Sequence, residues 1–555
     1  MNDAWVGMGA SIVNRRDFVK IAAASATASS FSAAPAARPN IILIMADDMG
    51  FSDLGCYGSE IATPNIDKLA ASGVRFTHFR NTARCCPSRT SLLTGLYSHQ
   101  AGVGHMVNPR PGLPAYQGDL NRSCVTIAQV LKGAGYRTMM SGKWHVTPNN
   151  GKKHNWPLQR GFDQYYGIIA GAASYYHPQA LVRDNTPIEG EGADFFLTDA
   201  IGQNAVEYIQ NAAKRPEPFF LYTAFTSPHW PLHAIESDIE RHRGRYRDGW
   251  DALREERHKR QIEMGLVNPK WGLTPRDEDV PAWKDAPDRE WQQRRMEVYA
   301  AQIDRMDRNV GAIMDALRRT GKDQDTLVML LADNGGCAEE LPAGKINNSS
   351  PKQARDGRPM RPGNAPSIMP GGEDTFGSYG IGWANASNTP FRRYKHWVHE
   401  GGIASPMIAN WPRGIPKPGS LTHENGHVID FMATCVDVAG ASYPESQDGG
   451  KILPMEGKSL VPAFKGKKIE RRDAFFWEHE GNRAMVEGRY KLVSRFPNRW
   501  ELYDLKSDRC EMRDLAGAYP ARLASMTARH EAWSKRCGVV PWEEVNKIKA
   551  VDAGG

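Results

Sequence analysis

The sequence has few cysteines, no long internal apolar run and no clustered basic charge. Beyond the N-terminal segment, no stretch approaches the roughly 20 apolar residues that a membrane-spanning helix requires. We therefore expect the mature protein to be soluble, without stable membrane insertion. No dense Lys/Arg stripe interleaved with aromatic residues occurs, which argues against nucleic acid as a partner. The formal net charge of +7 over 555 residues fits an anionic small substrate or plain solubility better than nucleic acid.

Eight cysteines are too few and too scattered for a disulfide framework in a chain of this length. One or two disulfide bridges are still compatible with the sequence. The chain has no CxxC pair and no His/Cys cluster with zinc spacing, which argues against a thiolate metal site. With 41% hydrophobic and 24% charged residues, the composition is that of an ordinary globular protein. The length suits one large domain with a smaller companion, or three modest domains.

The N-terminal segment has the pattern of an export signal. "NRRDFVK" (14–20), with Arg15 and Arg16 as the pair, precedes a weakly apolar run of small residues and an A-x-A-like cleavage point at 34–36. It is similar to a twin-arginine signal. Residues 1–36 are therefore predicted to be a signal peptide, the protein to be periplasmic, and the twin-arginine export machinery to be a partner. The alternative is a mobile basic tail.

Short apolar runs alternate with amphipathic helical patterns through the first three hundred residues of the mature chain. This alternation predicts an α/β fold with a largely parallel sheet covered by helices. The clearest strands are 40–46, 138–142, 219–225 and 326–332, and the helical patterns are 63–73, 197–214 and 299–321. In the first helix Thr63 is placed as the cap, Pro64 in the first turn and Gly73 as the stop.

Three further segments differ in composition. The Arg/Glu-rich stretch from about 236 to 296 indicates a solvated helical insertion, and 341–382, rich in Gly, Pro, Ser and Asn, indicates a long loop. From about 463 onward, short strand-like runs separated by turn residues precede a helix at about 520–535. They predict a small C-terminal subdomain with an antiparallel sheet and a helix beside the main sheet.

Polar and ionisable side chains follow each of the four strong strands. They are Asp47, Asp48, Lys143, His145, His229, Asp333 and Asn334. In a parallel sheet the crevice at the carboxyl ends of the strands binds ligands, so we expect these groups to meet in one pocket. One "ADD" after a strand is an ordinary turn, but the second occurrence, "ADN", favours a site. Three carboxylates and an amide carbonyl form an all-oxygen set, which suits Ca²⁺ or Mg²⁺.

The stretch "RCCPSRTSLLTG" (84–95) places two adjacent cysteines ahead of an apolar helical run. A disulfide, a metal site or a nucleophile would each explain them. Pro87 suits the first turn of a helix, which puts Cys85 just ahead of a helix N-terminus, where free N–H groups and the helix dipole favour anions. Such a position would activate a thiolate and attract a sulfate or phosphate. The alternative is a vicinal Cys85–Cys86 disulfide, whose ring is strained.

These motifs together resemble the type I sulfatases of the alkaline phosphatase superfamily. The family signature, Cys-x-Pro-Ser/Thr-Arg followed by Thr-Gly, stands here at 85–89 and 94–95. The resemblance extends through 39–58, 142–145, 227–233, 331–336, 388–402 and 501–508. It implies an alkaline phosphatase-like fold, with a large mixed, mostly parallel sheet flanked by helices. We place the catalytic domain at 37–462 and the small C-terminal subdomain at 463–555.

In that family the first signature cysteine is oxidised, before folding, to formylglycine, whose hydrated aldehyde is the nucleophile. The resemblance implies that Cys85 is the residue converted, by a formylglycine-generating maturation enzyme, while Cys86 holds the variable position and has no assigned role. It also implies a cation, Ca²⁺ with Mg²⁺ as the alternative, held by Asp47, Asp48, Asp333, Asn334 and the oxygen at residue 85.

The remaining roles follow from the same resemblance. Arg89 would steady the hydrated aldehyde and the metal site, and His145 would take a proton when the enzyme is regenerated. The groups that would grip the sulfate and the leaving oxygen are Lys143, His229 and Lys395. Asp333 is the expected base for the attacking hydroxyl, and His229 or Lys395 the acid for the leaving alcohol, with His229 preferred.

The chemistry of sulfate esters fits these roles. Negative charge grows on the leaving oxygen as the S–O bond breaks, so a cation and two ammonium groups stabilise the transition state more than the ground state. One hydroxyl of a gem-diol attacks sulfur, and the other expels sulfate by reforming the aldehyde. The sequence therefore predicts an arylsulfatase-like sulfuric ester hydrolase that acts on a small-molecule or glycan sulfate ester.

Two rival functions stay open. One is a hydrolase of the same superfamily that acts on phosphonate monoesters or phosphodiesters. The other is a catalytically inactive glycan-binding protein that keeps the fold. Aryl, steroid and carbohydrate sulfates all remain candidate natural substrates.

Overall fold

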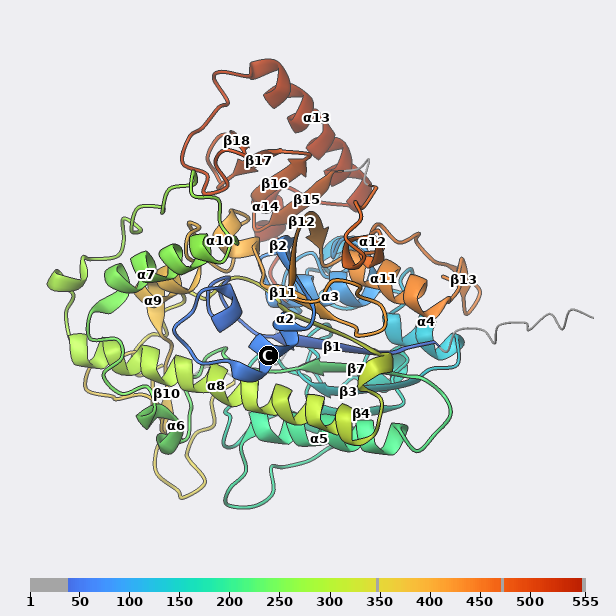
Figure 1. Cartoon of the computed structure of the whole chain (residues 1–555), viewed down its shortest axis with the longest axis horizontal. Helices are drawn as coiled ribbons and strands as arrows, with labels where there is room; N and C mark the ends of the chain where they lie inside the picture. Colours follow the sequence, from blue (N-terminus) through green and yellow to red (C-terminus); the bar gives the residue numbers. More distant parts are fainter. Residues whose placement is uncertain (1–37, 346–348, 471–473, 552–555) are drawn as a thin grey trace, which may run out of the picture. The chain divides into compact units, whose positions relative to one another are not determined.

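The computed structural model describes residues 38–345, 349–470 and 474–551. The predicted signal peptide, residues 1–36, lies outside these ranges. The largest feature is a ten-stranded sheet (Figure 1). In spatial order its strands are β12 (Ser420–His427), β2 (Val74–Arg80), β11 (Met407–Asn410), β8 (Thr326–Ala332), β1 (Asn40–Ala46), β7 (Phe219–Ala224), β3 (Arg137–Gly142), β4 (Gln164–Ile168), β5 (Leu181–Arg183) and β6 (Thr186–Pro187).

The centre of this sheet is parallel. β1 pairs in parallel with β7 and β8, and β3 pairs in parallel with β7 and β4. β11 runs antiparallel between β2 and β8, and β5 runs antiparallel between β4 and β6. The predicted α/β fold with a mixed, mostly parallel sheet is therefore confirmed. The four predicted strands are β1, β3, β7 and β8.

Both faces of the sheet are buried. Alternate residues of a strand point to opposite faces, so one strand contributes to two apolar cores. In β1, Ile42 and Ile44 join one apolar core, whereas Ile41 and Leu43 join another. The first core includes α2 (Pro64–Ala71), α5 (Leu197–Ala212) and α8 (Arg289–Arg319). The second includes α3 (Cys85–Thr94), α4 (Ile127–Gly133) and α11 (Asp430–Ala439). Figure 1 shows α5 and α8 lying along each other on one side of the sheet.

The N-terminus of α2 is capped differently from the sequence prediction. The side chain of Thr63 makes no capping hydrogen bond to the helix, and it donates instead to Asp67. The carboxylate of Asp307, on α8, accepts from the backbone N–H groups of Asn65 and Ile66 at 3.1 and 2.8 Å. The cap comes from a distant helix, so local sequence did not indicate it.

The Arg/Glu-rich stretch is more buried than its composition indicates. It forms α6 (Glu236–Glu240), α7 (Gly249–Glu263) and the first turns of α8, which begins ten residues before the predicted start at 299. Arg257 on α7 is fully buried and pairs with Asp53 at 2.7 Å and Glu60 at 2.8 Å. The predicted helical insertion is present and many of its residues are exposed, but Arg257 is not solvated. Composition did not indicate this, because charges that are paired inside the protein look the same in composition as solvated ones.

The long loop and the C-terminal region follow the prediction more closely. Between 341 and 382 the described regular elements are two short strands, β9 (Arg361–Pro362) and β10 (Thr375–Phe376), before α9 (Gly380–Ser387) begins. The predicted C-terminal antiparallel sheet contains β15 (Phe475–His479), β16 (Asn482–Glu487), β17 (Tyr490–Ser494) and β18 (Glu501–Asp504). α13 (Pro520–Cys537) covers this sheet in Figure 1. Within the described ranges, no helix has the length and apolar character that crossing a membrane requires.

Candidate active site

Two neighbouring strands place four oxygen-bearing side chains side by side. Asp47 and Asp48 follow β1, and Asp333 and Asn334 follow β8, whose Ala332 lies opposite Ala46 in the register. The backbone N–H of Asp48 donates to Asp333 Oδ1 at 3.1 Å, and Asn334 Nδ2 donates to Asp48 Oδ1 at 2.7 Å. All four side chains are buried. The structure thus brings the predicted oxygen set together.

The signature cysteine opens α3. Cys85 is the first residue of the helix rather than the residue just ahead of it. This start is compatible with Pro87, because N–H groups in the first turn of a helix have no intrahelical partner. One turn further along, Arg89 Nη2 lies 2.8 Å from Asp333 Oδ2 and 3.5 Å from Asp47 Oδ2. Cys85 and Arg89 therefore face the oxygen cluster together.

Strand β3 delivers Lys143 to the same cluster. Its Nζ lies 2.6 Å from Asp47 Oδ2, and the side chain is fully buried. Gly142, at the end of β3, has a φ of 119°, and a Cβ there would lie 1.9 Å from the carbonyl oxygen of Ala224 on β7. Only glycine fits between the strands at this point, so the sequence "SGK" is needed to bring the lysine into the site.

His229 and Lys395 lie near the second carboxylate oxygen of Asp48. Lys395 Nζ lies 2.9 Å from Asp48 Oδ2 and 3.3 Å from His229 Nε2. His229 Nε2 in turn lies 3.4 Å from Asp48 Oδ2, and its Nδ1 lies 2.6 Å from the carbonyl oxygen of Trp230. The structure therefore gathers Lys395, which follows the end of β8 by more than sixty residues, with the residues at the strand ends.

Burial and neighbouring charges change the acidity of these groups. Burial and the charge of Asp47 raise the pKa of Asp333 to about 7. Burial alone would raise the pKa of Asp48, but His229 and Lys395 hold it below its ordinary value. Burial lowers the pKa of both His145 and His229 to about 4. Both imidazoles are therefore neutral near pH 7.

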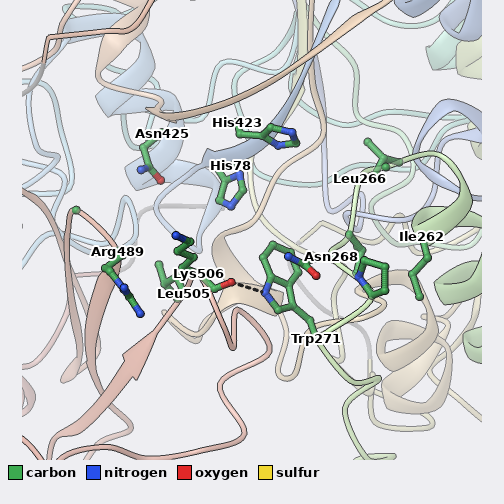
Figure 2. Close-up of a pocket in the computed structure, with 14 residues that line it drawn as sticks. His78, Ile262, Leu266, Asn268, Trp271, His423, Asn425, Arg489, Leu505 and Lys506 are labelled. Carbon is green, nitrogen blue, oxygen red and sulfur yellow. Dashed lines mark hydrogen bonds between the residues drawn. The ribbon is translucent and has the colours of Figure 1, made fainter.

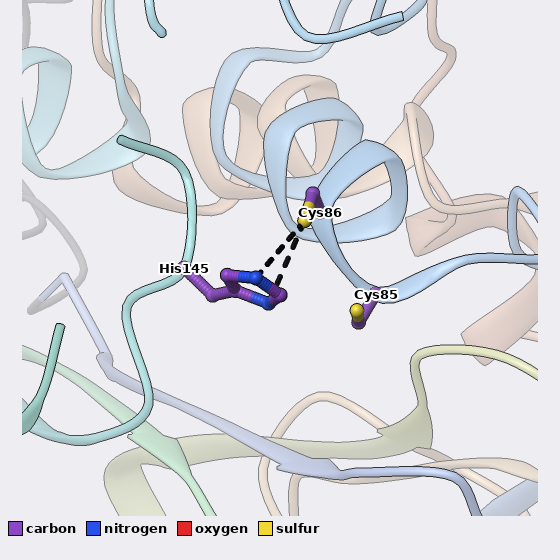
Figure 3. Close-up of side chains that lie close together, drawn as sticks. All are labelled: Cys85, Cys86 and His145. Carbon is purple, nitrogen blue, oxygen red and sulfur yellow. Dashed lines mark hydrogen bonds between the residues drawn. The ribbon is translucent and has the colours of Figure 1, made fainter. Parts of the chain in front are cut away.

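Cys86, to which the sequence assigned no role, contacts His145. Figure 3 shows its sulfur beside the imidazole ring, 3.2 Å from Nε2 and 3.5 Å from Nδ1. Cys85 and Cys86 are both free thiols, so the vicinal disulfide is not formed. The interaction with the Cys86 thiol and the charge of Lys143 hold the pKa of Cys85 well below its ordinary value.

Glu339 is a further charged residue at this site that the sequence analysis missed. Its Oε1 lies 2.7 Å from Arg84 Nη1, and its Oε2 accepts from Trp230 Nε1 at 2.8 Å. Burial would raise the pKa of Glu339, but the charges of Lys395 and Arg84 hold it well below its usual range. Glu339 follows Asp333 by six residues. This short separation is the one sequence feature that could have indicated a place in the site, and it is a weak one.

A divalent cation fits the oxygen cluster. Asp47 Oδ1 and Asn334 Oδ1 are buried, and neither has a hydrogen-bond partner among the described residues. Carboxylate and amide oxygens are the ligands that Ca²⁺ and Mg²⁺ prefer. Asp47, Asp48, Asp333 and Asn334 would hold such an ion, and His229 lies close enough to Asp47 and Asp48 to offer a nitrogen as well.

The structure also contains a cavity of about 660 Å³ that is separate from this cluster. Figure 2 shows Trp271 at its wall, donating from Nε1 to the carbonyl oxygen of Lys506 at 3.2 Å, with His78, His423 and Arg489 nearby. None of the sequence-predicted site residues lines it. The oxygen cluster is thus distinguished by its buried ionisable groups rather than by cavity volume.

Comparison with known proteins identifies the family. A family model described as Sulfatase matches residues 39–441, and one described as N-sulphoglucosamine sulphohydrolase, C-terminal, matches residues 392–530. An uncharacterized sulfatase of Schizosaccharomyces pombe is 32% identical over 91% of this chain and 94% of its own length. An arylsulfatase of Klebsiella aerogenes is 31% identical over 79% of this chain and 95% of its own length.

Solved structures share the fold. The structure described as Ps i-CgsB in complex with k-i-k-neocarrahexaose has a TM-score of 0.64 and 24% identity, covering 90% of this chain and 93% of that one. The phosphonate monoester hydrolase of Agrobacterium radiobacter has a TM-score of 0.56 and 19% identity, covering 90% of this chain and 96% of that one. The family match spans most of the chain, and the oxygen cluster lies within it; the chain therefore belongs to the sulfatase family and is a sulfuric ester hydrolase.

Proposed function

We propose that this sulfatase hydrolyses aryl sulfates and uses residue 85, converted from cysteine to formylglycine, as its nucleophile. The observation that carries the proposal is the place of Cys85 at the first turn of α3, where the charges of Asp47 and Lys143 act on it. The N-terminus of a helix favours anions. A sulfate group bound there would therefore have its sulfur near residue 85.

The other side chains bind and polarise the ester. Lys143 and Lys395 come from two separate segments and present two ammonium groups to the cluster. Hydrolysis consumes water, breaks the bond between sulfur and the ester oxygen, and delivers a proton to that oxygen. A Ca²⁺ ion held by the carboxylates and Asn334 would supply further positive charge to the sulfate oxygens. These charges act most strongly when negative charge is greatest, which is in the transition state.

The hydrogen bonds of His229 indicate how the leaving oxygen is protonated. A carbonyl oxygen only accepts, so His229 Nδ1 carries the proton that faces Trp230, 2.6 Å away. In the neutral imidazole, Nε2 then has no proton of its own and accepts from Lys395 Nζ at 3.3 Å. We infer that Lys395 supplies the proton and that His229, the acid predicted from the sequence, works as a pair with it.

The mass of the tryptic peptide "CCPSR" (85–89) tests the nucleophile. The chain is produced in a host that has a formylglycine-generating enzyme, because the proposal needs that partner. A peptide in which the –CH2–SH side chain of residue 85 has become an aldehyde, –CHO, so that an oxygen replaces the sulfur and two hydrogens are lost, supports the proposal when fragment masses place the change at 85. Two unmodified cysteines in protein that nonetheless turns over an aryl sulfate would contradict it.

A comparison of substrates tests the rival activity. The phosphonate monoester hydrolase shares the fold at 19% identity, which carries no inference about substrate. The experiment measures kcat/KM for 4-nitrophenyl sulfate and for 4-nitrophenyl phenylphosphonate with the same matured protein. We expect a higher kcat/KM for the sulfate, and a preference for the phosphonate would favour the rival. A sulfated glycan as natural substrate is compatible with a preference for sulfate.

The location is also a proposal. The supporting observation is the twin-arginine pattern at 14–20, which lies outside the described residues. Replacement of Arg15 and Arg16 by lysine should keep the protein in the cytoplasm of a Gram-negative host, whereas the unchanged chain should be recovered in the periplasmic fraction. Periplasmic recovery of both forms would contradict the proposal.

A further inference from the structure

Three histidines and one glutamate from distant parts of the chain meet beside the catalytic cluster. His105 lies in the loop between α3 and the short helix at Pro114–Tyr116, and His396 follows Lys395. His479 ends β15, and Glu480 lies in the turn to β16. We call these four residues the histidine–glutamate cluster. None of them belongs to the sulfatase mechanism proposed above.

The distances within the cluster approach those of a metal centre. Glu480 Oε1 lies 2.6 Å from His105 Nε2 and 3.7 Å from His479 Nε2, and Glu480 Oε2 lies 2.9 Å from His396 Nδ1. His105, His479 and Glu480 can offer three ligand atoms that lie within 4.8 Å of one another. In a tetrahedral zinc site with ligand bonds of about 2.0–2.2 Å, neighbouring ligand atoms lie roughly 3.3–3.6 Å apart. Small side-chain movements would therefore complete the coordination.

The buried ring of His479 indicates that hydrogen bonds alone do not satisfy this cluster. The side chain is 0% exposed, and neither ring nitrogen has a hydrogen-bond partner among the described residues. His105 Nδ1 is also buried without such a partner in the described part of the chain. A buried polar atom without a partner costs free energy. A cation bound through His479 Nε2 would remove that cost for one of these atoms.

We propose that the histidine–glutamate cluster binds a divalent transition metal of the Zn²⁺ class. Imidazole nitrogens and one carboxylate suit Zn²⁺, Ni²⁺ or Cu²⁺. The catalytic cluster, by contrast, is built from oxygens and suits Ca²⁺ or Mg²⁺. The two sites should therefore bind different ions from one mixed solution.

The bound metal would link the hairpin formed by β15 and β16 to the loops that carry His105 and His396. The backbone N–H of His396 donates to the carbonyl oxygen of Ala83, two residues before Cys85, at 2.8 Å. Arg84, whose guanidinium is within electrostatic reach of Glu480, would oppose a cation. Glu339 balances that guanidinium through its contact at 2.7 Å. The metal would thus link residues that are far apart in the sequence, such as 105 and 479, at the edge of the active site.

Cobalt absorption tests this site without any need for turnover. The full chain is stripped with a chelator, saturated with Ca²⁺ to fill the all-oxygen site, and titrated with Co²⁺ as the probe. We expect one equivalent of Co²⁺ to bind with the intense ligand-field bands of a four- or five-coordinate ion, and Zn²⁺ to displace it. Loss of an outer-sphere partner typically costs 10–100-fold in metal affinity, so loss of a ligand should weaken binding by at least about 100-fold.

Two variants and one matched control complete the test. Glu480→Gln is nearly isosteric and lies in a turn, so it should fold, and His479→Asn removes the buried ring. Both should lose tight Co²⁺ binding. His154→Asn removes a histidine that pairs with Asp119 at 2.6 Å elsewhere, and it should bind Co²⁺ as the unchanged chain does. The proposal is overturned when the calcium-loaded chain binds no stoichiometric Co²⁺, or when Glu480→Gln binds it with unchanged affinity.

Discussion

The sulfur of Cys86 lies 3.2 Å from Nε2 of His145, the residue predicted to take a proton when the enzyme is regenerated. His145 has a φ of 51°, in the left-handed region that only a few per cent of non-glycine residues adopt, histidine more often than most. Cys86 also contacts Met106, with 3.8 Å between the sulfur atoms. The variable position of the signature thus carries a side chain that holds the ring of His145.

Cys86 should therefore act as a positioning residue. We expect Cys86→Ala to lower kcat for an aryl sulfate by about tenfold, which corresponds to about 1.4 kcal/mol, with little change in KM. Cys86→Ser should restore part of the rate, because the hydroxyl is able to interact with the imidazole. The mass of the 85–89 peptide must show equal maturation in each variant. Cys435→Ala, which changes a buried cysteine on α11, is the control, and an unchanged kcat in matured Cys86→Ala would contradict the role.

The pair formed by Lys395 and His229 should matter most for esters of weakly acidic alcohols. We expect Lys395→Met and His229→Asn to reduce kcat/KM for an alkyl sulfate by about 10²–10⁴-fold, the range typical of general acid catalysis. The reduction should be much smaller for 4-nitrophenyl sulfate, because nitrophenolate leaves without a proton. Equal losses for both esters would show that the two side chains bind the sulfate and do not protonate the leaving oxygen.

Removal of the divalent cation should both destabilise and inactivate the enzyme. A ligand that binds only the native state stabilises it by about 2.7 kcal/mol when its concentration is a hundredfold above its Kd. Chelation should therefore lower Tm and abolish turnover, and Ca²⁺ should restore both more fully than Mg²⁺. Asn334→Ala, which removes a buried amide oxygen that has no hydrogen-bond partner in the described residues, should raise the Ca²⁺ concentration needed. Full activity of the chelated protein would contradict a catalytic cation.

Glu400, in α10 (Glu400–Ile403), should be a main source of stability. It is fully buried and lies 2.7 Å from Arg80, 2.7 Å from Arg509 and 3.1 Å from Lys491 of β17. Removal of one partner from a buried ion cluster typically costs 3–5 kcal/mol, so Glu400→Gln should lose about that much free energy of unfolding. Exposed Glu255→Gln, measured by the same denaturant unfolding, should lose almost nothing. A loss below about 1 kcal/mol in Glu400→Gln would contradict this role.

Glu400 should also make the free energy of unfolding depend on pH in the acid range. Burial alone would raise the pKa of Glu400, but Arg80, Lys491 and Arg509 hold it well below its usual range. Because the folded-state pKa is depressed, the stabilisation is fully present above the unfolded-state pKa of about 4.3 and is lost as pH falls below it. Stability of the unchanged chain should therefore decline more steeply below about pH 5 than that of Glu400→Gln. Parallel pH profiles would contradict this assignment.

The sequence by itself determined the sheet centre and most of the oxygen cluster. Strands such as 40–46 are continuous apolar runs because both faces of a parallel sheet are buried, and this pattern is readable without a structure. The ends of parallel strands lie at one edge, so Asp47 and Asp333 were predicted to meet. Arg89 follows Cys85 by four residues, which is one helical turn, and local spacing again sufficed.

Only the tertiary structure decided the contacts that join distant segments. The ring of His145 against Cys86, the carboxylate of Asp307 at the start of α2, and Glu400 among three cations each depend on how separate elements pack. The histidine–glutamate cluster is the clearest case, because residues 105, 396 and 479 have no spacing that indicates a common site. From composition alone, these three residues look like ordinary histidines in loops. These residues come together because the C-terminal sheet packs against the loops that carry His105 and His396. No local sequence pattern encodes this packing.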